Sequence, residues 1–270
     1  GNAFSYSYIE EIYFPASLKE LKEGWCKDVN NLKKIKISPL NGQFKIKDDK
    51  YLLGKSDQNK EEFDILYFAN RDIKQANIPS NIKIISSYAF DNCPNLENVE
   101  FEPNSNLQII KSYAFYDCSK IEEVFIPSTV TKICEGAFYF CHNLRKFEIP
   151  QNSNLKTIES KVFLRINMKD IYFPSSLEEL KEGWCNETSK LTKITISPLN
   201  SQFKIKDDKY LLGKSDKNKD EFDILLFANR DIKQANIPSN IKIISSYAFD
   251  NCKKLAKVEI PTNSNLQTIK

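Results

Sequence analysis

The chain repeats itself, and this internal repetition constrains its fold more than any other feature. Residues 12–111 align without a gap with residues 171–270, and 79 of these 100 positions are identical. The block from Phe68 to Cys93 recurs unchanged from Phe227 to Cys252. Two folded copies of one domain could give such a superperiod, so a shorter period inside each copy is needed to distinguish a pair of domains from a solenoid.

Each copy contains a finer unit of about 23 residues, a length typical of solenoid repeats. The unit reads Ile-x-x-Ile-x-x-x-x-Phe-x-x-Cys-x-x-Leu-x-x-Val-x-Ile-Pro, and its Phe position falls at Phe4, Cys26, Phe90, Phe115, Phe138, Phe163, Cys185 and Phe249. One such unit cannot bury its own apolar face, so neighbouring units must stack. The sequence therefore predicts a single repeat solenoid over residues 1–270.

The pattern inside each unit predicts short strands and turns, with few or short helices. Apolar residues alternate with polar ones in Leu96-x-x-Val99-x-Phe101, which is typical of a strand that buries one face. Prolines such as Pro127 and Pro150 stop these strands, and Asn-Ser-Asn segments favour turns. The Tyr-Ala-Phe segments that follow predict a bend that places each Phe in the core.

Two of the spacings between Phe positions are 64 residues long, and each holds one ordinary unit plus an insertion. The insertions occupy approximately residues 40–77 and 199–236. Alternation at 44–46, a polar turn and the apolar residues 51–53 predict a hairpin, and residues 63–69 predict a third strand. We therefore expect a small β-meander docked on the solenoid in each copy.

Both ends of the chain lie within repeats. Residue 1 falls in an Ala-Phe bend, and Lys270 matches Lys111, which precedes another Tyr-Ala-Phe. Neither end has the polar cap that terminal coils of a solenoid usually need. We expect a fragment of a longer array, or a chain that self-associates through its uncapped ends.

The units resemble the BspA-like leucine-rich repeats found in surface proteins of mucosal bacteria and protists. The segments 92–96, 117–121 and 140–144 carry this resemblance, through the pattern Ala-Phe-x-x-Cys-x-x-Leu before an Ile-Pro step. The resemblance implies a leucine-rich-repeat solenoid and a non-catalytic protein at the cell surface or outside the cell, used in adhesion to a host or matrix protein or glycan. The repeat markers are Phe90, Cys93, Phe115, Cys118, Phe138, Cys141, Phe249 and Cys252.

Composition excludes several other functions. Lys and Arg number 39 and Asp and Glu 36, giving a net charge of +3 with no basic tail, and nucleic acid is not an expected partner. The longest apolar run, Ile65–Ala69, is far shorter than the roughly 20 residues that cross a bilayer. We expect no membrane insertion within this chain and no cofactor.

The seven cysteines suggest structural thiols more than disulfides or a metal site. Cys93, Cys118, Cys141 and Cys252 share one repeat position that faces the core, and no Cys-x-x-Cys pair supports a zinc site. We expect buried, reduced thiols at these positions. Cys134 lies off this register and is expected to be exposed.

The sequence contains little evidence for a group of catalytic residues. His142 is the only histidine, so no nucleophile, base and orienting group can be assembled around it in the usual way. Carboxylates gather in the insertions at Asp48, Asp49, Asp57 and Asp64, but interleaved lysines oppose a calcium site. We interpret these aspartates as turn formers and solvated charges, and we predict neither catalytic nor metal-binding residues.

The outward positions of the strands form the candidate ligand face. Solenoids bind through such rows, because every coil contributes one or two side chains to a continuous surface. Exposed aromatic residues bordered by charges are typical of contact hot spots. The predicted face comprises Asn98, Glu100, Glu123, Phe125, Lys146, Glu148, Asp170 and Tyr172.

Three functions remain open at this point. The first is a non-catalytic cell-surface protein that presents this face to a host protein, a glycan or another cell. The second is an intracellular protein-interaction scaffold, which free thiols throughout would favour. The third is a polysaccharide-acting enzyme on a β-solenoid, which would need carboxylates or basic groups stacked on adjacent coils.

Overall fold

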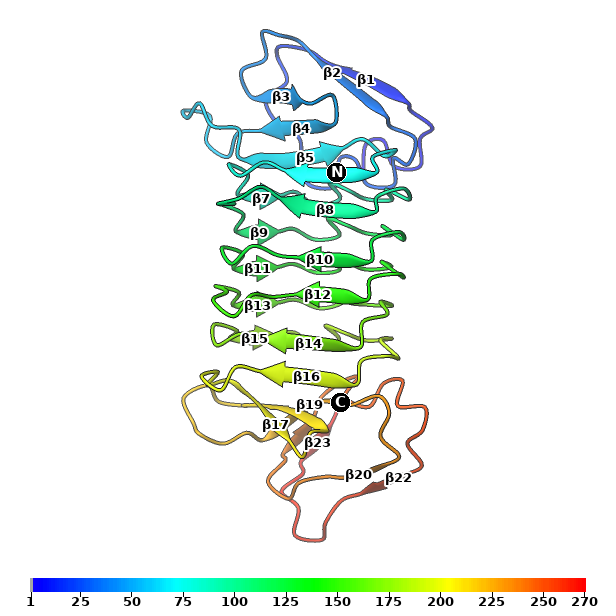
Figure 1. Cartoon of the computed structure of the whole chain (residues 1–270), viewed down its shortest axis with the longest axis vertical. Helices are drawn as coiled ribbons and strands as arrows, with labels where there is room; N and C mark the ends of the chain where they lie inside the picture. Colours follow the sequence, from blue (N-terminus) through cyan, green and yellow to red (C-terminus); the bar gives the residue numbers. More distant parts are fainter. Residues whose placement is uncertain (1) are drawn as a thin grey trace.

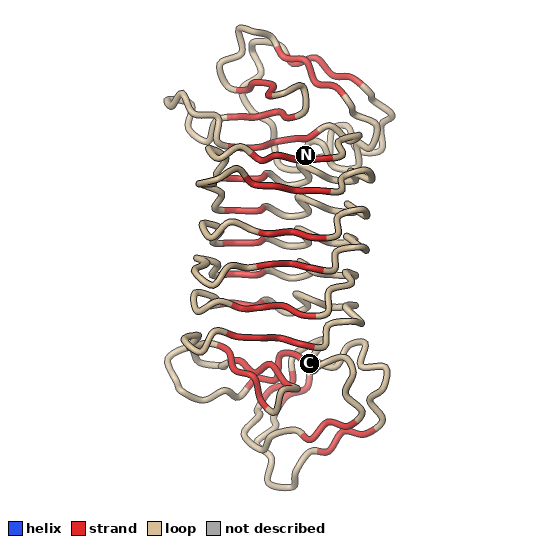
Figure 2. The backbone as a smooth tube through the Cα atoms, in the orientation of Figure 1, coloured by secondary structure: helices blue, strands red, loops and turns tan. Residues whose placement is uncertain are grey.

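Short strands on one side of a stack of coils form what we call the front face. The computed structural model describes residues 2–270, in which strands and turns alternate and no helix occurs (Figure 2). The coils lie one above another along the long axis (Figure 1). The front strands are β1 (Glu11–Phe14), β2 (Lys34–Ile37), β6 (Gln75–Ile78), β8 (Asn98–Phe101), β10 (Glu123–Phe125), β12 (Lys146–Glu148), β14 (Asp170–Phe173), β16 (Lys193–Ile196), β20 (Gln234–Asn236) and β22 (Lys257–Glu259).

Behind the front strands, two-residue strands pair in parallel from coil to coil and form the rear sheet (Figure 1). Ile85 pairs with Ile110, which pairs with Ile133, so identical repeat positions stack directly. The two-residue strands of this sheet are β7 (Ile84–Ile85), β9 (Ile109–Ile110), β11 (Lys132–Ile133), β13 (Thr157–Ile158) and β15 (Glu179–Leu180), while β21 (Ile243–Ile244) and β23 (Thr268–Ile269) pair in a separate sheet of the second copy. This arrangement confirms the predicted β-solenoid.

The repeat markers form the core between the two faces. Phe115 is fully buried and its ring stacks on Phe90 and Phe138, at centroid distances of 4.7 and 5.1 Å. The thiol of Cys118 donates to the carbonyl oxygen of Phe90 at 3.0 Å, and Cys141 repeats this contact with Phe115 at 3.1 Å. Cysteine suits the position because it is small, apolar and able to donate to the preceding coil. All seven cysteines are free and buried.

The bend before each Phe requires left-handed backbone. Tyr88, Tyr113, Gly136 and Lys161 occupy this position in successive coils, with φ between 57° and 62°. At Gly136 the need for glycine is also steric, because a Cβ atom would lie 2.4 Å from the ring of Tyr113. The backbone nitrogens of Phe90 and Phe115 donate to the next coil, to Ala114 and Ala137. The bend is therefore a third ladder of hydrogen bonds between coils.

Each insertion contains the predicted antiparallel meander. In the first copy it comprises β3 (Phe44–Lys47), β4 (Tyr51–Gly54) and β5 (Ile65–Ala69), and in the second β17 (Phe203–Lys206), β18 (Tyr210–Gly213) and β19 (Ile224–Ala228). The third strand, β5, is part of the solenoid itself, because it pairs in parallel with β7 and continues the rear sheet. The chain then forms β6, which pairs with β8. The end of the insertion is thus a short coil of the solenoid.

The short coil lacks a bend, and a buried arginine fills the missing space. Only Asn70, Arg71 and Asp72 separate β5 from Ile73, so the bend at Cys26 lies directly against the bend at Tyr88. The Arg71 side chain donates to the carbonyl oxygens of Cys26 (3.0 Å), Val29 (3.3 Å), Tyr88 (3.2 Å) and Ala89 (3.0 Å). In the second copy, Arg230 donates to Ala228, Tyr247 and Ala248. We call each of these a guanidinium bridge.

Asp91 lies beside the first guanidinium bridge and is 1% exposed. Its Oδ2 accepts a hydrogen bond from the backbone nitrogen of Asp28 at 2.8 Å, whereas its Oδ1 has no partner among the described residues. Burial raises the pKa of the Asp91 carboxyl to about 6, and the charge of Arg71 offsets this only in part. The folded chain therefore binds the Asp91 proton more tightly than the unfolded chain does.

This difference predicts that the protein becomes more stable as the pH falls from 7 to 5. An unfolded aspartate titrates near pH 3.9, so protonation favours the folded state between about pH 6 and pH 4. Asp91→Asn should remove this dependence and raise the free energy of unfolding at pH 7 by about 3 kcal/mol. Urea denaturation across this pH range measures both effects, with the exposed Asp72→Asn as control. An unchanged slope in Asp91→Asn would contradict the assignment.

Candidate functional site

The predicted ligand face lies on four neighbouring front strands. Residues 98 and 100 come from β8, 123 and 125 from β10, 146 and 148 from β12, and 170 and 172 from β14. All eight side chains are exposed except Tyr172, which is half-buried. Between β10 and β12 the register pairs Glu123 with Lys146 and Phe125 with Glu148. The eight residues thus form two adjacent outward rows.

The front face is divided into strand pairs, which the repeat pattern did not predict. β6 pairs with β8, β10 with β12, and β14 with β16, but β8 and β10 are not joined in one sheet. Two shallow grooves of about 740 and 490 Å³ lie at this division. Glu100 and Phe125 line both grooves, and the turn at Asn104–Asn106 closes one side of the larger groove.

Phe125 is the central aromatic group of this face. Its side chain is 46% exposed, and the Lys146 ammonium lies 4.5 Å from its ring centroid. Lys146 also forms an ion pair with Glu148 at 3.1 Å. The lysine is therefore held over the ring by a cation–π contact and by a carboxylate. The result is an exposed aromatic surface bordered by fixed charges of both signs.

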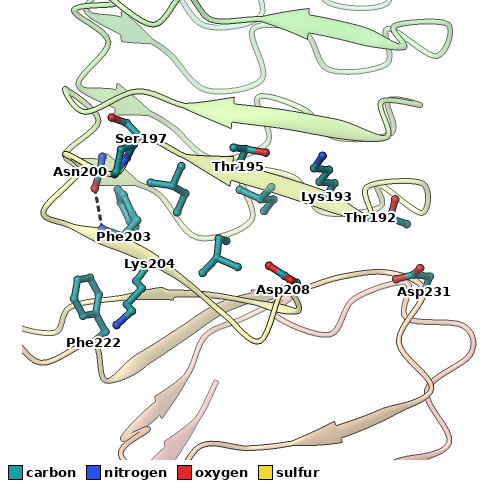
Figure 3. A pocket seen from close by; sticks show the side chains of 14 residues that line it. Thr192, Lys193, Thr195, Ser197, Asn200, Phe203, Lys204, Asp208, Phe222 and Asp231 are labelled. Atoms are coloured by element: carbon teal, nitrogen blue, oxygen red, sulfur yellow. Dashed lines mark hydrogen bonds between the residues drawn. The ribbon is translucent and has the colours of Figure 1, made fainter.

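A larger cleft of about 920 Å³ lies where the front face is interrupted after β16 (Figure 3). The chain leaves the coil at Ser197 to form β17, and the next front strand, β20, pairs with β22 instead of β16. Phe203, Lys204 and Phe222 lie toward one end of this cleft. The sequence did not predict this cleft, because the alternation within β16 does not show which edge of the strand lacks a neighbouring strand. The insertion that follows β16 is the signal that points to it.

The aspartates considered as catalytic or metal-binding candidates occupy structural positions. Asp48 and Asp49 have φ of 55° and 50° in the hairpin turn between β3 and β4. Asp64 is buried and accepts hydrogen bonds from Ser56 (2.7 and 2.9 Å) and Lys83 (3.2 Å). Burial alone would raise the pKa of Asp64, but these hydrogen bonds and the Lys83 charge lower it overall. Asp64 therefore anchors the loop as a charged group.

The prediction for Cys134 was wrong. The residue does replace Ser86 and Lys111 in the register of the rear sheet, since its nitrogen bonds to Ile110 as theirs bond to the preceding coil. Its side chain is nevertheless only 7% exposed, and burial raises the pKa of the thiol to about 11. A side chain as short as cysteine is covered by the longer lysines and glutamates around it.

Within residues 2–270, no group of three or more His, Cys, Asp or Glu side chains is arranged to hold a metal ion. In the same part of the chain, no helix is long and apolar enough to cross a membrane.

Sequence comparison identifies the repeat. A model of the BspA type leucine-rich repeat region matches six copies, at residues 1–48, 61–192 and 221–270. The chain belongs to the BspA-type leucine-rich repeat family. The unmatched residues 49–60 and 193–220 fall around the two insertions, where the repeat pattern is broken. None of the curated proteins matches this BspA-type chain significantly in sequence.

Solved structures share the fold. The pneumococcal vaccine antigen PcpA superimposes with a TM-score of 0.61 at 24% identity, covering 76% of this chain and 48% of the antigen. A leucine-rich cell surface protein from Faecalibacterium prausnitzii gives 0.59 at 20% identity, covering 83% and 76%. A leucine-rich repeat protein from Bacteroides ovatus gives 0.57 at 21% identity, covering 81% and 54%. The BspA-type chain thus spans about half the length of two of these three proteins.

Proposed function

We propose that this BspA-type repeat protein is a non-catalytic binding module displayed at a cell surface, and that its front face holds a host or matrix protein or a glycan. The observation that carries the proposal is Phe125, exposed between two grooves and bordered by charges. Aromatic groups in such settings supply much of the binding energy of contact surfaces. The family and the cell-surface protein among its structural relatives support display outside the cell.

The charges of the front face favour binding over catalysis. Opposite signs alternate along one outward row, where Lys146 lies between Glu123 and Asp170, and the other row places aromatic rings between its carboxylates. Hydrolysis of a polysaccharide by two carboxyl groups needs those groups to face each other across the scissile bond. Mixed charges around an aromatic ring suit a partner that presents both polar and apolar groups.

The proposal predicts that the double substitution Phe125→Ala and Tyr172→Ala weakens binding by about tenfold or more, as expected for loss of hot-spot side chains. The measurement is binding of the intact protein to an array of matrix proteins and glycans, followed by titration of each ligand found. Tyr13→Ala is the matched control, because Tyr13 is 62% exposed on a front strand beyond the first insertion. Ligands that bind the double variant and the wild type equally would place binding elsewhere.

A further inference from the structure

We propose that the cleft beside β16 is a second binding site, which takes an extended polypeptide as an added strand. The occupant has a lysine or arginine at its amino end, followed by alternating apolar residues, and runs parallel to β16. This site lies beyond β14 and is separate from the grooves at Phe125. The proposal rests on a free strand edge, a preformed wall and a pair of carboxylates.

The first step concerns the main chain of β16. Lys193 donates its N–H to Lys169 and Ser197 donates to Phe173, so alternate residues of β16 face β14. The N–H and C=O groups of Ile194 and Ile196 therefore point to the opposite side, into the cleft. Within residues 2–270, β14 is the only strand that pairs with β16. Such an edge can pair with an incoming peptide through main-chain hydrogen bonds.

The second step concerns the wall opposite this edge. Ile205, Phe203 and Phe222 line the cleft and offer an apolar surface to every second side chain of an added strand. Asn200 fixes the loop that leads into the wall (Figure 3). Its Nδ2 donates to the carbonyl oxygens of Pro174 (2.8 Å) and Leu177 (2.9 Å), while its Oδ1 accepts from Phe203 (2.9 Å). The cleft is therefore held open without an occupant.

The third step concerns charge. Asp208 and Asp231 lie toward the end of the cleft where β16 begins, near Thr192 (Figure 3). Both carboxylates are exposed, and neither is within ion-pair distance of a lysine or arginine of the described chain, whereas the adjacent Asp207 pairs with Lys206. A parallel strand enters at this end with its amino terminus, so a basic side chain there meets two free carboxylates. This complementarity selects both the direction and the chemistry of the occupant.

The first copy of the superperiod provides an internal comparison. There, Lys33 and Lys36 stand in place of Thr192 and Thr195. Lys36 pairs with Glu11 on the neighbouring strand, and Lys33 lies 3.9 Å from Glu10. A lysine at position 33 places positive charge where the basic residue of the occupant would bind. We therefore expect one peptide per chain, bound in the second copy.

A suitable probe is a capped, fluorescently labelled peptide with the sequence of residues 169–174, Lys-Asp-Ile-Tyr-Phe-Pro. It has the required basic residue and apolar residues at alternate positions. In β14 the same segment already aligns its Asp170 with Lys193, on the other edge of β16. Fluorescence anisotropy with the full chain should show saturable binding with one site per chain. Absence of saturable binding would overturn the proposal.

Methylation of single peptide nitrogens tests whether the peptide adds as a parallel strand. In the proposed register the N–H of the peptide's Tyr172 donates to β16, and the N–H of its Phe173 points away. N-methylation at Tyr172 should weaken binding about tenfold, the effect of one lost hydrogen bond of roughly 1.4 kcal/mol, and N-methylation at Phe173 should not. Equal effects of the two methyl groups would overturn parallel strand addition even if the peptide binds.

Exchange of residues between the two copies tests whether the peptide binds in the cleft beside β16. Thr192→Lys with Thr195→Lys should weaken binding by about tenfold, through repulsion of the peptide's basic residue. This variant should fold, because the first copy carries lysines at the two matching positions, in and just before its front strand. The reverse change, Lys33→Thr with Lys36→Thr, should raise the stoichiometry toward two peptides per chain. Binding that neither exchange alters would place the peptide elsewhere and overturn the proposal.

Discussion

Replacing Arg71 with methionine should lower the free energy of unfolding by about 3–5 kcal/mol, the range for removing one partner from a buried charged network. Methionine fills much of the same volume but donates no hydrogen bond. The carbonyl oxygens of Cys26 and Val29 would then be buried without their donor, and those of Tyr88 and Ala89 would keep the backbone nitrogens of Asp91 and Ala69 as donors. Thermal and urea unfolding followed by circular dichroism measures the loss.

Two other arginine-to-methionine variants serve as controls for the loss of the Arg71 hydrogen bonds. Arg145→Met removes an exposed arginine whose recorded ion pair is with Glu122 at 3.4 Å, and should cost less than about 1 kcal/mol. Arg230→Met should cost less than Arg71→Met, because Arg230 bonds to fewer carbonyl oxygens of the facing bends. If Arg71→Met were as stable as the wild type, the guanidinium bridge would not be what joins the two bends.

Replacing Phe115 with alanine should have an effect of similar size, about 3–5 kcal/mol, as for other large-to-small changes at fully buried aromatic positions. The substitution leaves a cavity between Phe90 and Phe138 and removes both ring contacts. Neighbouring coils provide most of the stability of a solenoid, so the coils on both sides should lose protection. Hydrogen exchange of Phe90 and Phe138 amides measures this local effect.

Phe115→Leu is the matched control for this change. Leucine preserves most of the buried apolar volume, so it should cost about 1–2 kcal/mol and leave exchange in the neighbouring coils slower than in Phe115→Ala. Equal losses for the two variants would show that ring stacking, rather than filled volume, holds the coils together.

Much of the solenoid could be predicted from the sequence, because its determinants are local and repeated. The spacing of Phe90, Phe115 and Phe138 located the core stack, and the shared register of Cys118 and Cys141 correctly indicated buried side chains. The alternation in 44–46 and the apolar run 51–53, with the polar turn between them, located the hairpin of the meander. Each of these features depends on residues that are close in sequence or separated by one repeat.

The remaining features depend on contacts that no repeat pattern encodes. Arginine is rarely buried, so nothing local marks Arg71 as a core residue. Its burial follows from a coil that is too short to form a bend, and that length becomes apparent only when β5 is seen to pair with β7. The rarity of arginine, with two of four at matching positions of the superperiod, is the signal that could have found it. The uncovered edge of β16 has the same origin.

The coil-to-coil hydrogen bonds also determine how the molecule responds to pulling. Each coil is bonded to its neighbours, so tension along the long axis loads the interfaces between successive coils in series. Such a chain gives way one coil at a time and lengthens in small steps, instead of rupturing in a single event. The guanidinium bridges join bends that are 64 residues apart in sequence. Arg71 joins the bend at Cys26 to that at Phe90, and Arg230 joins the bend at Phe249 to that at Cys185 through the Cys185 sulfur. The opening of either bridge would therefore release the longest steps.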